Sequence, residues 1–135
     1  GELKSIPDFD PRGASRAVKN EIRRNLLRAI EKAPATLDAY FAEAETARGG
    51  HALLDRHVAA LKDDMRDLAD FEYRARDLVD RMAVGLQAAL LTKHAPSMVA
   101  DAFCRSRLDA RGHHQYGALP RDVDCRKIFE RALPR

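Results

Sequence analysis

Apolar residues recur at intervals of three and four along residues 71–108, and this spacing predicts helices. Between Phe71 and Leu90 the pattern is that of one buried helical face held for more than five turns. Pro96 interrupts it, because its ring clashes with the preceding turn and its nitrogen has no hydrogen to donate. A second helix is expected from Ser97 to Leu108, which gives a central bent hairpin. The residues expected to be buried in it are Phe71, Ala75, Leu78, Val79, Met82, Leu86, Ala89, Leu90, Met98, Val99, Ala102 and Phe103.

Four shorter helices are expected around this hairpin, at residues 16–32, 35–48, 52–68 and 124–133. Ser15 is a suitable N-cap for the first, and Gly49-Gly50 a suitable end for the second. The prediction is an all-α, single-domain bundle of about six helices at residues 15–135, after an extended arm at 1–14 that is rich in Pro and Gly. The apolar stripes expected to face the core are Val18, Ile22, Leu26 and Ile30; Leu37, Tyr40, Phe41 and Ala44; Leu54, Val58, Leu61, Met65 and Leu68; and Ile128, Phe129 and Ala132.

Length and composition fit one domain with a core of its own, since the chain has 135 residues of which 45% are hydrophobic. No apolar run reaches the 18 or so residues of a membrane span, and no signal peptide opens the chain, so no membrane partner is expected. Two cysteines, Cys104 and Cys125, are too few for a disulfide scaffold. These features lead us to expect a cytoplasmic protein without a structural disulfide.

Charge is distributed unevenly along the chain. Residues 1–34 hold eight Lys and Arg against five Asp and Glu, residues 35–103 eight against twelve, and residues 104–135 eight against four. The ends are therefore basic and the middle is acidic. A basic end attracts phosphates through charge and counterion release, largely without regard to base sequence. The alternative is that the cations pair with the acidic middle, at Asp63, Asp67, Asp70 and their neighbours.

Candidate chemistry is sparse. Cys104, His113, His114 and Cys125 carry zinc-ligand atoms, but their spacing is not that of paired zinc knuckles. A buried thiol beside a core aromatic is the commoner fate of a residue such as Cys104. His94 is better placed to interact with the negative end of the long helix than to act in catalysis. No residue is assigned a catalytic or metal-binding role.

Several runs of residues resemble a known family. The run RMAVGLQAALLTKHAPSMVADAFCRSRL, followed by YGALPRDVD, is similar to the C-terminal tail of AidB-like proteins, which are adaptive-response members of the acyl-CoA dehydrogenase superfamily. LLRAIEKAPATLDAYFAEAETARGG and LLDRHVAALKDD resemble the same family, so the likeness covers roughly Leu26 to Leu133. The resemblance implies a role in the DNA alkylation response. It also implies DNA binding, because that family is associated with DNA binding through its basic C-terminal helices.

The expected function is a non-catalytic helical module that binds DNA without sequence preference, or a protein partner or second copy of itself, through its basic ends. The residues expected to bind nucleic acid are Arg16, Lys19, Arg23, Arg105, Arg107, Arg111, Arg121, Arg126, Lys127 and Arg131.

The alternative is a fragment or subunit of an FAD-dependent flavoenzyme of the acyl-CoA dehydrogenase type, and only then is FAD expected. Family members carry a Gly-Asn pair where this chain has Lys19 and Asn20. A Gly that lets backbone approach a flavin is not replaceable by Lys, which disfavours a flavin on this chain alone. GELK followed by SRAVKNEIRRNLLRAI also resembles the lead segment of magnesium-chelatase-like ATPases, but no GxxxxGK[ST] loop follows, so no ATPase is inferred.

Overall fold

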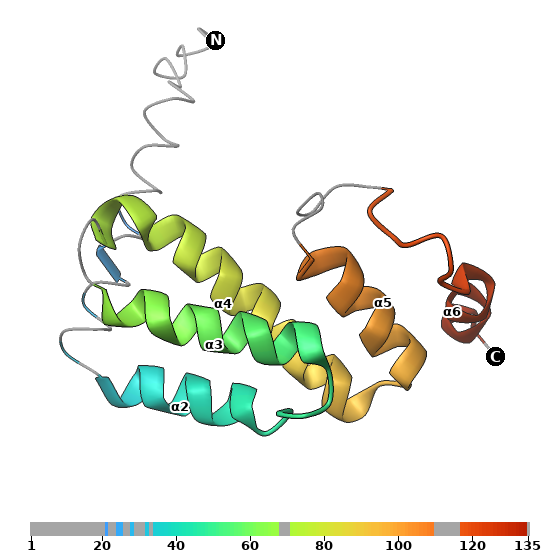
Figure 1. Ribbon diagram of the computed structural model, residues 1–135, viewed down its shortest axis with the longest axis horizontal. Helices are drawn as coiled ribbons and strands as arrows, with labels where there is room; N and C mark the ends of the chain where they lie inside the picture. The colour runs from blue at the N-terminus through green and yellow to red at the C-terminus, as the bar shows by residue number, and fades with distance from the viewer. Residues whose placement is uncertain are drawn as a thin grey trace, which may run out of the picture.

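The computed structural model describes residues 34–67, 71–109 and 117–134, together with Glu21, Arg24, Asn25, Arg28 and Lys32. These residues form five helices and no strand (Figure 1). The all-α prediction is confirmed, with five helices in the described part where about six were expected for the chain. The predicted arm at 1–14, and most of the predicted helix at 16–32, lie outside the described residues. The helices are α2 (Pro34–Glu45), α3 (Ala52–Arg66), α4 (Phe71–His94), α5 (Ser97–Arg107) and α6 (Cys125–Ala132).

Helix α4 is the centre of the bundle, as its long periodic pattern predicted. It packs against α2, α3 and α5, and α5 turns back from its end after Pro96 (Figure 1). Two clusters make up the core. One joins α2, α3, α4 and α5, and the other joins α3 to the first half of α4. The buried residues of these clusters are Ala44, Ala47, Leu54, Val58, Ala88, Ala89 and Cys104, and Leu61, Ala75 and Leu78.

The second half of α4 buries the expected Ala89 and its neighbour Ala88 more fully than the larger residues that were expected beside them. Ala88 and Ala89 are fully enclosed, whereas Leu86 is only partly buried and Leu90 is 41% exposed. The prediction that Leu90 lies in the core was therefore wrong, and Leu86 is less buried than predicted. Met98, another predicted core residue, is 37% exposed. The buried face is chosen by how closely the neighbouring helices approach, and close approach favours side chains with little bulk.

Gly85 allows α2 and α3 to approach α4 closely. A Cβ at this position would lie 3.0 Å from the Tyr40 hydroxyl oxygen and 3.1 Å from His57 Cδ2. Tyr40 on α2 donates a hydrogen bond to the carbonyl oxygen of Met82 at 2.7 Å, and His57 Nε2 on α3 donates to that of Arg81 at 2.8 Å. Burial of the Tyr40 phenol raises its pKa to about 12, so the hydroxyl remains a donor even in mildly alkaline solution. Two helices are thus fixed to the backbone of α4 at one turn.

The turn between α2 and α3 follows the predicted glycine stop. Gly49 has φ +81°, a left-handed conformation that suits Gly, and its N–H donates to the Asp55 carboxylate at 3.1 and 3.2 Å. His51 then caps α3, with its Nδ1 accepting the Leu53 N–H at 3.2 Å. Both ends of the turn are therefore held by side chains of residues 51–55.

Helix α6 departs most from the prediction. Ile128, Phe129 and Ala132 were expected to face the core, yet α6 has no buried residue and Phe129 is 63% exposed. Within the described part of the chain, the extensive helix–helix contacts all involve α2 to α5. Figure 1 shows α6 at the end of the molecule, beyond α5. None of the described helices is both long enough and apolar enough to cross a membrane.

Candidate nucleic-acid interface

The structure describes six of the ten cations expected to bind nucleic acid, and it separates them into two groups. Arg105 and Arg107 lie on α5 and are partly buried, whereas the other four are exposed and lie on or just before α6. Arg16, Lys19, Arg23 and Arg111 lie outside the described residues. The four exposed cations are Arg121, Arg126, Lys127 and Arg131.

Arg105 is engaged within the protein. Its Nη1 and Nη2 atoms donate to the two carboxylate oxygens of Asp122 at 2.9 and 2.7 Å, and Nη1 also reaches Asp101 at 3.3 Å. The hydrogen bond to Asp122, then that to Asp101, raises the pKa of Arg105 above its ordinary value, and the same contact lowers the pKa of Asp122. Both terminal nitrogens of the Arg105 guanidinium therefore donate hydrogen bonds within the protein. Arg105 is not an available phosphate ligand in this arrangement.

Arg107 is also a poor phosphate ligand. Its side chain is half-buried in the last turn of α5, and its Nη1 is enclosed without a hydrogen-bond partner among the described residues. A guanidinium held in this way contributes its stem to packing and keeps only part of its donors toward solvent.

The cations of α6 have a different environment. Arg126 pairs with Glu130 at 2.9 Å and Lys127 with Asp124 at 3.5 Å, both within the same helix or its cap. The side chain of Arg126 is 87% exposed and that of Lys127 is 68% exposed. Exposed pairs of this kind contribute little and are screened by salt, so these cations can exchange a carboxylate for a phosphate. No ion pair of Arg121 or Arg131 is found among the described residues, and both are exposed.

Most ion pairs of the acidic middle are formed within it. Asp64 on α3 accepts from Arg81 at 2.5 Å and from Arg74 at 3.0 Å, both on α4, and the hydrogen bond from Arg81 is the main reason that its pKa is lowered. Three other pairs of residues 35–103 are three or four positions apart: Asp63 with Arg66, Asp77 with Arg81, and Glu45 with Arg48. Three more join segments that are distant in sequence: Glu43 with Lys93, Glu45 with Lys62, and His51 with Asp101. From the basic C-terminal end, Arg105 pairs with the acidic middle at Asp101, whereas Asp63 pairs within its own helix.

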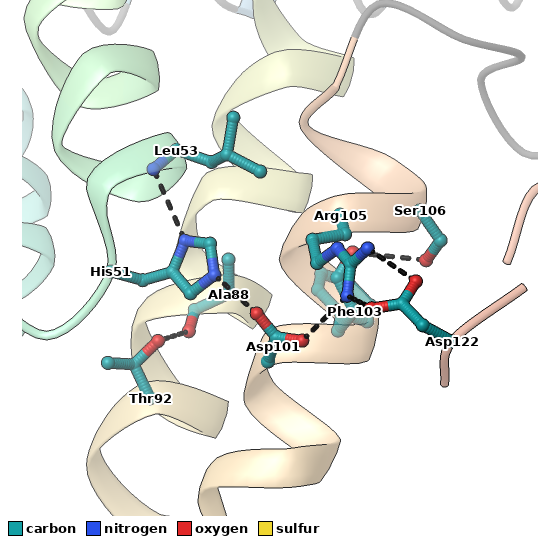
Figure 2. Close-up of polar contacts among 9 residues, drawn as sticks. All are labelled: His51, Leu53, Ala88, Thr92, Asp101, Phe103, Arg105, Ser106 and Asp122. Carbon is teal, nitrogen blue, oxygen red and sulfur yellow. Dashed lines mark hydrogen bonds and ion pairs between the residues drawn. The ribbon is translucent and has the colours of Figure 1, made fainter. Parts of the chain in front are cut away.

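Sequence reasoning missed a polar chain that links α3, α5 and the residues before α6 (Figure 2). Since Nδ1 of His51 accepts the Leu53 N–H, its Nε2 carries the proton and donates to Asp101 at 3.1 Å. The second carboxylate oxygen of Asp101 holds Arg105, which in turn holds Asp122. The signal in the sequence was weak. His51 follows Gly49-Gly50 directly before an apolar run, but His is not among the usual N-cap residues.

A shallow groove lies between α2 and α3, with a volume of about 330 Å³. Its apolar floor is formed by Ala44, Val58 and Ala59. The charges of its lining balance, because it contains three carboxylates and three cations: Glu45, Asp55, Asp63, Arg48, Lys62 and Arg66. The groove therefore presents no excess charge to a ligand.

Cys104 and Cys125 are both free thiols in the structure. Cys104 is fully buried with its pKa raised by that burial, whereas Cys125 is an exposed free thiol at the start of α6. His113 and His114 lie outside the described residues. A zinc site formed by these two histidines with the two cysteines is therefore not tested by the structure. In the part of the chain that the structure describes, no three Cys, His, Asp or Glu side chains gather as metal ligands would.

Comparison of this chain with protein-family models, curated proteins and solved structures finds no match in any of the three.

Proposed function

We propose that this chain is a non-catalytic helical module that binds the DNA backbone through α6 and the turn before it. The observation that carries the proposal is the exposure of Arg121, Arg126, Lys127 and Arg131 on a segment that packs against no core. The resemblance to AidB-like proteins adds support of a different kind, since those proteins are associated with DNA binding through the corresponding region.

The arrangement of α6 suits a phosphate track. At 100° per residue, Arg126, Lys127, Glu130 and Arg131 share one side of the helix, and the apolar residues share the other. Arg121 extends the same charge into the turn that precedes the helix. Contacts of this kind neutralise phosphates and fix orientation, but they carry no information about base sequence. We therefore expect weak, salt-sensitive and sequence-independent binding.

The test is a fluorescence-anisotropy titration of a labelled duplex with the full chain, at several salt concentrations. If roughly three to five phosphates are neutralised, the slope of log affinity against log salt is about −3 to −5. Arg126→Ala/Lys127→Ala/Arg131→Ala is expected to abolish most of the binding.

The matched control is Arg48→Ala/Arg66→Ala/Arg76→Ala, which removes the same charge from exposed positions on the bundle. Equal loss in both triple variants would show that only net charge matters and would remove α6 from its assigned role. Absence of binding at about 20 mM salt, where screening is weak, would refute the proposal.

A second candidate is docking of α6 on a protein. The observation that favours it is the stripe of Cys125, Ile128, Phe129 and Ala132, which the fold leaves largely uncovered. An amphipathic helix presents such a stripe to an apolar groove. Loss of partner capture in Phe129→Ser with DNA affinity unchanged would favour this function over the first.

The flavoenzyme alternative has its own test. A flavin absorbance band at about one flavin per chain after purification would replace the binding-module proposal with a cofactor-dependent one. We expect none from this chain alone.

A further inference from the structure

Arg105 of α5 is hydrogen-bonded to Asp122 in the segment 117–134. Within the described residues, the side-chain hydrogen bonds between this segment and α2–α5 both run from Arg105 to Asp122. They form a bidentate fork, which restrains angle as well as distance. Among the described residues, α6 buries no side chain and makes no extensive contact with α2–α5. The ion pair of Arg105 with Asp122 is thus the polar side-chain link between the segment that carries α6 and the bundle among the described residues.

The bundle side of this pair is itself held in place. Asp101 accepts from Arg105 at 3.3 Å through one oxygen and from His51 at 3.1 Å through the other (Figure 2). The His51 ring is fixed by the Leu53 N–H, and its side chain is only 17% exposed. Arg105 is therefore oriented by residues of both α3 and α5 before it meets Asp122.

The other side of the pair leads directly into α6. Asp122 lies in a turn closed by the Val123 N–H on the Pro120 carbonyl oxygen at 3.2 Å, and the Cys125 N–H bonds to the Val123 carbonyl oxygen at 2.9 Å. Asp124 then caps the helix by accepting the Lys127 N–H at 3.1 Å. Only Val123 separates the anchored carboxylate from this cap, so holding Asp122 restrains the direction of α6.

We infer that Arg105 is a positioning residue for the cationic face of α6, and that the pair Arg105–Asp122 is the latch that holds this face in one orientation. This replaces its expected role as a phosphate ligand. The effect of the latch on DNA binding rests on the proposed function, whereas the latch itself does not. An unlatched α6 adopts the binding orientation for only a fraction of the time, and the apparent affinity falls by that fraction.

Cys125 provides a probe of the latch in the full chain. It is exposed at the first position of α6, whereas Cys104 is fully buried, so a maleimide nitroxide labels Cys125 preferentially in the folded protein. We expect the electron paramagnetic resonance lines of the label to sharpen in Asp122→Asn and in Arg105→Gln. The double variant Arg105→Gln/Asp122→Asn is expected to be no more mobile than either single variant, because both remove the same contact. Unchanged line widths in both single variants would overturn the latch.

Arg105→Lys tests positioning without changing net charge. Lys retains the cation but cannot make the bidentate fork. We expect this variant to mobilise the label and to weaken DNA binding by about three- to tenfold. Arg66→Lys, in an exposed pair within α3, is the control and is expected to change neither. A mobile label with unaltered DNA affinity would overturn the positioning role. If the unmodified chain binds no DNA, the proposed function fails while the label still decides the latch.

Discussion

Helices α3 and α6 are both amphipathic, yet α3 buries its stripe of Leu54, Val58 and Leu61 while α6 buries no residue. Both begin with a side-chain cap, from His51 in α3 and from Asp124 in α6, so the local signals that start a helix are satisfied in each. The difference lies in what the chain places opposite the stripe. Helix α3 meets α4 along its length, whereas α6 is connected to the bundle through the ion pair of Arg105 with Asp122. An apolar stripe predicts a helix but does not by itself identify the surface that covers it.

The largest difference between the two helices is expected from truncating α3. Leu61 has no exposed surface and packs with Ala75 and Leu78 of α4. Leu61→Ala should lower the free energy of unfolding by about 2–5 kcal/mol, because it removes apolar contacts and leaves a cavity. Urea denaturation followed by circular dichroism measures this loss. A loss below about 1 kcal/mol would mean that the site collapses or that the α3–α4 contact is looser than described.

A smaller loss is expected from Gly85→Ala. The added Cβ meets the Tyr40 hydroxyl at 3.0 Å and His57 at 3.1 Å, and neither can withdraw without weakening its hydrogen bond to α4. Overpacking costs about 1–3 kcal/mol, and the better helix propensity of Ala returns up to about 1 kcal/mol. The net destabilisation is measured by urea denaturation. The same change in a Tyr40→Phe background should cost less, since the clashing oxygen is gone; an equal or larger cost there would contradict the assigned clash.

The sequence predicted the positions of the helices better than it predicted the contacts of the candidate site. Periodicity placed α2 to α5 to within a few residues, because each of these helices has an apolar face and a Pro or Gly at one of its boundaries. It placed Ala75, Leu78 and Ala89 of α4 in the core correctly, but it missed Ala88, which is enclosed, and included Leu90, which is exposed. That choice depends on how near α2 and α3 come at Gly85, and spacing along one helix contains no such information.

The candidate site shows the same limit. The cations near α6 could be enumerated from the sequence, but Arg105 could not be separated from them. Its partner Asp122 is 17 residues away along the chain, and no helical periodicity relates the two. Pairs that do follow helical spacing, such as Arg126 with Glu130, were visible in principle and are the ones that contribute least. The expected core position of Phe129 failed for a related reason, since burial requires a partner surface.

Acid should weaken the bundle through Asp64. Because Arg81, and then Arg74, lower the pKa of this carboxyl in the folded protein, its contribution is fully present above the unfolded value of about 3.9 and is lost as the pH falls through the folded value. Thermal unfolding between pH 7 and pH 3 should therefore show a smaller decline for Asp64→Asn than for the unmodified chain. Asp63→Asn is the control, since its pair with Arg66 is exposed and lies within α3 alone. An identical acid slope in Asp64→Asn and the unmodified chain would show that the contact does not link α3 to α4.

The smallest effect is expected from Phe129→Ser, the counterpart on α6 of truncating Leu61. Phe129 is 63% exposed, so the substitution removes little buried surface and leaves no cavity in the core. The free energy of unfolding in urea should change by no more than about 0.5 kcal/mol, as is usual for surface positions. The result decides whether the two helices really differ. A loss above about 1 kcal/mol in the isolated chain would mean that the stripe of α6 is covered in solution, either by this chain or by a second copy. Repeating the measurement at tenfold lower protein concentration separates those cases, because a cover supplied by a second copy weakens on dilution whereas one supplied by the same chain does not.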